Sequence, residues 1–137
     1  MTTPSGAAPL NPPPAGGRAR RPWQPQPLLT ITSGRHGQWY TLILNGELDV
    51  ASAPDLQSAL DHPLATMAPP YVALDLAALS FCDSSGLNTI LRGWRGAARE
   101  GGELILLRPH ARVTALLRLT GLDQRLTVAP HLNEPSG

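Results

Sequence analysis

The sequence predicts an α/β fold in which about five strands form one mixed sheet, helices pack on that sheet, and the elements follow the order β-β-α-β-α-β-α-β. Two observations carry this prediction. Two apolar runs on either side of a glycine-bounded turn are typical of a β-hairpin, and the runs after them alternate between strand-like and helix-like spacing. Strands linked through helices become parallel neighbours, because such crossovers are right-handed and return to the same sheet. With 137 residues, the chain is long enough for one domain with its own core.

The opening hairpin is expected to pair residues 28–32 with residues 38–44, around a turn bounded by Gly34 and Gly37. Residues 46–49, with the sequence Gly-Glu-Leu-Asp, are expected to form a loop after the second strand.

A first helix should start at Ser52, because a serine hydroxyl is a good N-cap, with Pro54 in its first turn. Proline lacks a backbone N–H, so Pro63 is expected to end or kink this helix. Its core-facing residues should be Leu56, Ala59 and Leu60.

The central strand is predicted at residues 71–76, an almost unbroken apolar run of the kind that is covered on both faces. A second helix should begin near Ser84, because Asp83 and Ser84 are both good N-cap residues. Residues three and four positions apart share a face of this helix. The predicted inward face comprises Leu87, Ile90, Leu91, Trp94 and Ala98, and the outward face comprises Asn88, Thr89, Arg92, Arg95 and Arg99.

The rest of the domain follows the same alternation. Gly101 and Gly102 should close the second helix, and residues 103–107 read as another buried strand. Pro109 should open a third helix, with Gly121 at its end, and residues 126–128 should form a short last strand. The core-facing residues of the third helix should be Val113, Leu116 and Leu117.

The turn between the central strand and the second helix gives the strongest functional signal. The run Phe81-Cys82-Asp83-Ser84-Ser85-Gly86-Leu87, together with Leu74-Asp75-Leu76 and with Gly46-Glu47-Leu48-Asp49 upstream, resembles the STAS domain of bacterial anti-sigma factor antagonists. The resemblance extends from about Leu28 to Val128. It implies a single STAS-like domain in which Ser84, the first serine after the aspartate, is phosphorylated by a partner kinase. By itself the serine pair would be interpreted as capping alone.

The resemblance also implies a function. The unphosphorylated chain would bind an anti-sigma factor with serine kinase activity and so release a sigma factor. Phosphorylation of Ser84 with ATP would end this binding, and a separate serine phosphatase would restore it. The implied partner-binding residues are Glu47, Asp49, Asp83, Ser84, Ser85, Gly86, Leu87 and Asn88.

Two carboxylates have structural interpretations as well. Asp49 could equally be a turn or cap residue before Ser52, and Asp75 is expected to be a structural hydrogen-bonding residue near a strand end. Two other functions also stay open: a STAS scaffold that is not phosphorylated, and the regulatory subunit of a transporter.

Composition argues against several other classes. The formal net charge of +1 supplies no strong field for direct binding of DNA or an anionic membrane. The single cysteine, Cys82, excludes an internal disulfide, and the chain has neither an apolar run long enough for a membrane span nor a signal peptide, so we expect a cytoplasmic protein.

The sequence does not predict an enzyme. The four histidines lack metal-ligand spacing, so no metal or other cofactor is expected. The absence of lysine excludes a P-loop, and Ser84 lies in no hydrolase motif and has no identifiable base.

Three regions are expected along the chain. Residues 1–27 contain eight of the fifteen prolines and should be a disordered tail, residues 28–130 should form the domain, and residues 131–137 should be a short C-terminal tail. STAS domains usually carry a further C-terminal helix, and here it should be short or absent.

Overall fold

The computed structural model describes residues 28–133, and the α/β fold class and the element order are both confirmed. The predictions for residues 1–27, and for the tail from residue 134 onward, lie outside the described residues. A short 3₁₀ turn, η1, precedes the last strand and was not predicted. The elements are β1 (Leu29–His36), β2 (Trp39–Leu48), α1 (Ala53–Thr66), β3 (Tyr71–Cys82), α2 (Ser84–Arg99), β4 (Glu103–Leu107), α3 (Ala111–Thr120), η1 (Leu122–Gln124) and β5 (Thr127–Ala129).

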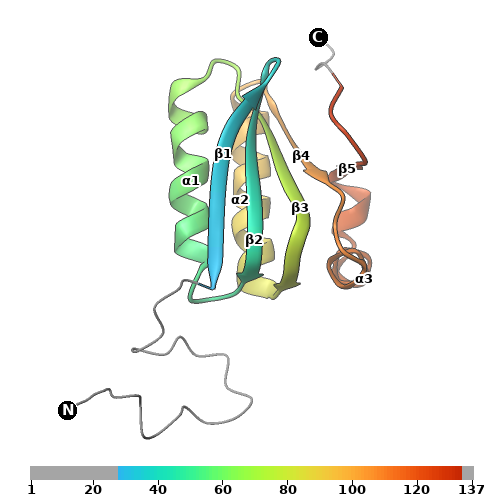
Figure 1. The fold of residues 1–137 in the computed structure, drawn as a ribbon. Coiled ribbons are helices and arrows are strands. Elements are labelled where there is room, and N and C mark those ends of the chain that lie inside the picture. Colours follow the sequence, from blue (N-terminus) through green and yellow to red (C-terminus); the bar gives the residue numbers. More distant parts are fainter. Residues whose placement is uncertain (1–27, 134–137) are drawn as a thin grey trace, which may run out of the picture.

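The five strands form one sheet in the order β1-β2-β3-β4-β5. β1 is antiparallel to β2, as a hairpin requires, and all the later neighbours are parallel. Figure 1 shows α1 and α2 side by side behind the sheet, with α3 beyond β3 and β4. The sheet is therefore mixed, as predicted, and two helices cover the same face of it.

The main core lies between this face of the sheet and the helices, and α3 contributes Val113 and Leu117 to it. Leucines of the three inner strands are fully buried there against apolar residues of α1 and α2. The strand residues include Leu44, Leu74 and Leu104, and the helix residues include Leu56, Leu60 and Ile90.

The opposite face of the sheet has a smaller cluster around Trp39, which is 3 % exposed. Leu132 packs against this cluster, and the Trp39 Nε1–H donates a hydrogen bond of 2.5 Å to the carbonyl of Asn133. Residues 130–133 contain no helix. An extended segment therefore covers one end of this face.

The hairpin strands are longer than predicted. The turn is only Gly37 and Gln38, and residues 46–48 belong to β2 instead of forming a loop. The reason is that β3 continues to Cys82, so that Glu47 and Leu48 still have neighbours in register opposite Phe81 and Cys82. The pairing of β2 with β3 shifts register between Gly46 and Glu47, where Gly46 has a φ of 119°.

α1 also departs from two local rules. Pro63 does not end it, because the helix continues to Thr66 and the Met67 N–H donates to the Pro63 carbonyl. Ser52 occupies the N-cap position, but its hydroxyl makes no cap hydrogen bond and points back toward the preceding turn.

The inward face of α2 differs in part from the predicted one. Thr89 is 1 % exposed, because it faces the neighbouring α1, whereas Ala98 is exposed. The packing of α1 beside α2 thus widens the buried face on one side. The residues buried on α2 are Gly86, Leu87, Thr89, Ile90, Gly93 and Ala97.

Candidate functional site

Ser84 is the first residue of α2, immediately after β3 ends. The Asp83 side chain caps the helix, with its carboxylate accepting a hydrogen bond of 3.1 Å from the Gly86 N–H. Ser84 is exposed at this helix start, and Ser85 is half-buried. An unhindered hydroxyl therefore stands at the positive end of a helix, beside one carboxylate that is already engaged as a cap.

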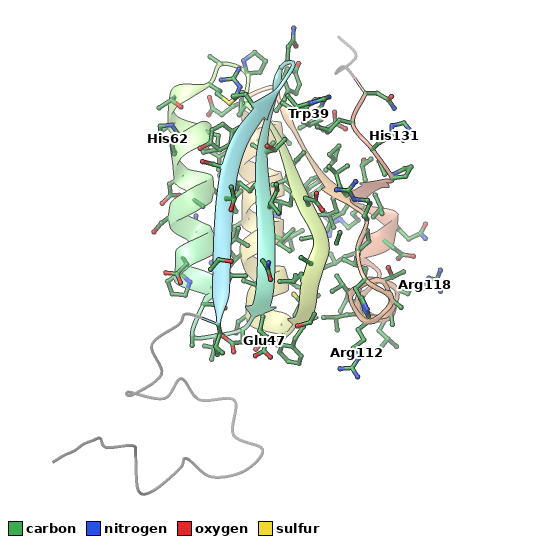
Figure 2. The ribbon with its side chains drawn as sticks, in the orientation of Figure 1. Trp39, Glu47, His62, Arg112, Arg118 and His131 are labelled. Carbon is green, nitrogen blue, oxygen red and sulfur yellow. The ribbon has the colours of Figure 1, made fainter. Side chains whose placement is uncertain are left out.

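The turn between β2 and α1 lies directly beside Ser84. The Asp83 N–H donates a hydrogen bond of 3.1 Å to the Leu48 carbonyl, which joins the end of β2 to the start of α2. Figure 2 shows Glu47 at the same end of the sheet. The structure thus brings the Glu47 and Asp49 segment next to Asp83 and Ser84, although more than thirty residues separate them in the sequence.

Asp49 has a structural role in this turn. It is 4 % exposed, and its carboxylate accepts hydrogen bonds of 3.0 Å from both the Ala51 and the Ser52 N–H groups. The buried Ser52 hydroxyl accepts a bond from the Asp49 N–H and donates to the Glu47 carbonyl, each at 2.9 Å. The turn is therefore held at both ends by its own polar groups.

This hydrogen-bonded turn exposes Val50, which was not among the predicted site residues. Its exposed fraction is 72 %. A single apolar residue in a polar loop gives no sequence signal, since its exposure depends on how the turn is folded. Val50 stands at the mouth of a groove of about 420 Å³ between α1 and α2. The groove is lined by Val50, Ala53, Pro54 and Gln57 on the α1 side and by Ser85, Asn88, Thr89 and Arg92 on α2.

Three of the predicted partner-binding residues, Asp49, Gly86 and Leu87, do not lie on the surface. Gly86 is buried and Leu87 is 4 % exposed, because both face the core from the first turn of α2. A Cβ on Gly86 would lie 2.6 Å from Leu48 Cγ, so only glycine lets α2 start this close to β2. These two residues position the helix start, and Asn88 remains exposed beside Ser85.

Cys82 lies beneath the turn and is unsuited to chemistry. Burial, with the nearby charge of Asp83, raises the pKa of its thiol from 9.0 to about 12. The thiol is therefore protonated near neutral pH and is a poor nucleophile. Between residues 28 and 133, no cluster of His, Cys, Asp and Glu could hold a metal ion. Over the same span, no helix is long and apolar enough to cross a bilayer.

Asp75 is a structural residue, as expected, but it lies inside β3 and not near the end of that strand, because β3 continues to Cys82. Its carboxylate accepts a hydrogen bond of 3.1 Å from the Ala77 N–H and forms an ion pair with Arg108. Arg108 follows β4 with a φ of 50°, so this pair fixes the strand end before α3.

The fold is that of a small α/β domain, and a serine hydroxyl is exposed where the central strand meets α2. The STAS domain family model matches residues 31–134, and the chain belongs to that family. An anti-sigma-B factor antagonist of Staphylococcus epidermidis is 29 % identical over 106 residues, which cover 77 % of this chain and 94 % of that protein.

Solved structures share the fold. An anti-sigma factor antagonist from Mycobacterium paratuberculosis is 27 % identical, with a TM-score of 0.68 over 76 % of this chain and 87 % of that one. The Bacillus cell fate determinant SpoIIAA in its phosphorylated form is 22 % identical, with a TM-score of 0.60 over 74 % of this chain and 93 % of that one.

Proposed function

We propose that this protein is an anti-sigma factor antagonist that is controlled by phosphorylation of Ser84. The exposed Ser84 hydroxyl at the capped start of α2, next to the turn that contains Glu47 and Asp49, is the observation that carries the proposal. The relatives named anti-sigma factor antagonists support it. Unphosphorylated, the chain binds an anti-sigma factor with serine kinase activity, and a sigma factor is released.

The chain contributes the phosphate acceptor and no other chemical group. Phosphoryl transfer requires a nucleotide, bound metal ions and a residue that orients the nucleophile, and the kinase supplies these. The Asp83 Oδ1 accepts the helix-cap hydrogen bond and the Cys82 thiol is protonated, so we assign the activating residue to the kinase. Ser84 is favoured over Ser85 because Ser85 is half-buried in the groove, where a kinase has less access. A separate serine phosphatase then regenerates the free hydroxyl.

Phosphorylation should leave the fold intact and disrupt the complex. The phosphate adds about 1.5 to 2 negative charges next to Asp83, but it also lies at the positive end of α2. The helix end stabilises an exposed anion by roughly 0.3 to 1 kcal/mol, similar in size to a screened repulsion between surface charges. In a closed interface, burying an uncompensated charge costs several kcal/mol, enough to lower affinity a hundredfold or more.

The test starts with capture of the wild-type chain's partners from its native host and identification of any kinase-type anti-sigma factor by mass spectrometry. The purified partner is then incubated with ATP and with the wild-type chain or one of three variants. We expect Ser84→Ala to bind and to accept no phosphate, Ser84→Asp to bind at least a hundredfold more weakly, and Ser85→Ala to be phosphorylated normally.

Two results would contradict the proposal. One is phosphate mapped to Ser85 in the wild-type chain. The other is full-strength binding by both Ser84→Asp and the phosphorylated chain, which would indicate a scaffold without a phosphorylation switch.

A further inference from the structure

The groove between α1 and α2 begins at the proposed phosphorylation turn and extends away from it. Ser85, the neighbour of Ser84, lines its first part, and Arg92 lines it two turns further along α2. Ala53 and Pro54 give the α1 side an apolar wall, whereas the α2 side is polar. A partner that covers Ser84 therefore meets a surface with one apolar and one polar side.

Val50 is an apolar side chain that is exposed to solvent and lines this groove. Its turn is fixed by the hydrogen bonds of Asp49 and Ser52, both of which are buried. Valine is also stiff about χ1. Little conformational entropy is then lost when Val50 is covered, so its burial in a partner would contribute directly to affinity.

Arg92 places a cationic group farther along the groove. Its Nε and Nη2 atoms lie 3.3 Å from the Gln57 Oε1 and the Thr89 Oγ1. Both acceptors are neutral, so these contacts orient the guanidinium without neutralising its charge. A guanidinium has five N–H donors, and a carboxylate accepts two of them in a bidentate pair.

Arg92 is placed to recognise a partner and not the phosphate on this chain. It lies eight residues after Ser84, which corresponds to about 12 Å along the axis of α2. In this structure the guanidinium is instead bonded to Gln57 and Thr89, which line the groove. An anion at Arg92 must be carried by a molecule that lies along the groove.

We propose that the groove between α1 and α2 receives a segment of the anti-sigma partner that places an apolar pocket over Val50 and a carboxylate on Arg92. The inference rests on the proposed function and specifies the chemistry of the partner. The affinity of the unphosphorylated complex then depends on Val50 and Arg92 as well as on the surroundings of Ser84.

The purified kinase-type partner is the probe, and calorimetry with the full chain measures its affinity. Val50→Ala should weaken binding about tenfold, as expected for two buried methylene groups, and Val50→Asp should weaken it further. Arg92→Gln should weaken binding about tenfold. Arg92→Glu should weaken binding more than Arg92→Gln does, and the difference in affinity between these two variants should shrink at high salt.

Matched controls lie on α3, which Figure 1 shows beside β4 and β5, at the opposite edge of the sheet from α1. Leu119 is 84 % exposed, and Figure 2 shows Arg118 extending from the same helix. Leu119→Asp and Arg118→Glu should bind as the wild type does. Circular dichroism melting checks that every variant is folded.

The outcomes separate the two proposals. Full affinity of both Val50→Asp and Arg92→Glu, with Ser84→Asp still weakened, would overturn the groove assignment and leave the switch in place. Weak binding by the groove variants, together with normal binding by both Ser84→Asp and the phosphorylated chain, would support the groove and overturn the switch. If no kinase-type partner binds the wild-type chain, both are wrong.

Discussion

At the scale of single residues, the polar groups near Ser84 differ in what they do. Asp49 and Ser52 are buried and bonded to backbone groups of their own turn, so they determine its shape. Asp83 caps α2. Ser84 and Asn88 are exposed beside them and are available to a partner. Residues that form the site and residues that would contact a partner are thus largely distinct.

Replacing Asp49 should therefore destabilise the free domain. Asp49→Ala removes the acceptor of the Ala51 and Ser52 N–H groups, and we expect a loss of about 2 to 3 kcal/mol in the free energy of unfolding. Asp49→Asn keeps an oxygen acceptor and should lose about half as much. Urea denaturation measures both. Asp55→Ala, at an exposed position in the first turn of α1, is the control and should cost less than about 1 kcal/mol. If Asp49→Ala leaves the free energy of unfolding unchanged, Asp49 does not stabilise the turn, and only a role in contacting a partner would be left for it.

The thiol of Cys82 should make stability depend on alkaline pH. Its pKa is raised from 9.0 to about 12 in the folded chain, so the unfolded chain loses this proton first. The stability that depends on the protonated thiol is fully present below about pH 9 and is lost as the pH rises toward about 12. From about pH 8 to about pH 10.5, wild type should lose about 1 to 2 kcal/mol more than Cys82→Ala, which cannot titrate there. Urea denaturation at both pH values tests this, and parallel losses would refute it.

At the scale of elements, α2 is shaped by how closely its neighbours approach. Its start is pressed against β2 and β3 at Gly86, whereas farther along it faces α1 across Gly93 and Gly96. Glycine inside a helix costs roughly 1 kcal/mol relative to alanine. The helix tolerates this cost where a side chain would collide with the core, and the position of Ser84 depends on the close contact at Gly86.

Alanine should have opposite effects at two of these glycines. At Gly86 the new Cβ would lie 2.6 Å from Leu48 Cγ and 3.0 Å from Cys82 Sγ, so we expect a loss of about 1 to 3 kcal/mol. At Gly96 the nearest atom is a terminal methyl of the half-buried Leu64, at 3.3 Å, and the gain in helix propensity should leave stability equal or slightly higher. Thermal unfolding distinguishes the two. Equal effects at both positions would show that packing against β2 does not position α2.

At the scale of the whole molecule, the two faces of the sheet are covered differently. Helices α1, α2 and α3 pack into the core on one face, whereas residues 130–133 reach only one end of the other (Figure 1). Trp39 is buried under that segment, yet Ile43 on the neighbouring part of the sheet is 43 % exposed. Leu132 and Asn133, which were expected to belong to a C-terminal tail, therefore contact this face of the domain.

Ending the chain after Ala129 should expose Trp39. The truncation removes the Asn133 carbonyl that accepts the Nε1–H bond and the apolar contact of Leu132, so we expect a loss of about 2 kcal/mol and a red shift of tryptophan emission. Leu132→Ala should lose about half as much. His131→Ala, an exposed position in the same segment, should change neither quantity. A truncated chain with unchanged emission would mean that the segment does not cover the ring.

The sequence alone determined the element order, the start of α2 and the family, because each is written in local patterns: apolar periodicity, capping residues and the Asp83 to Leu87 motif. Only the tertiary structure decided that β2 continues through Leu48, that Thr89 faces inward, and that Asp49 is bonded within its turn. It also revealed Val50 and Arg92 on one groove. Exposure and contact between distant segments depend on how β2, α1 and α2 pack together, and no local pattern encodes that packing.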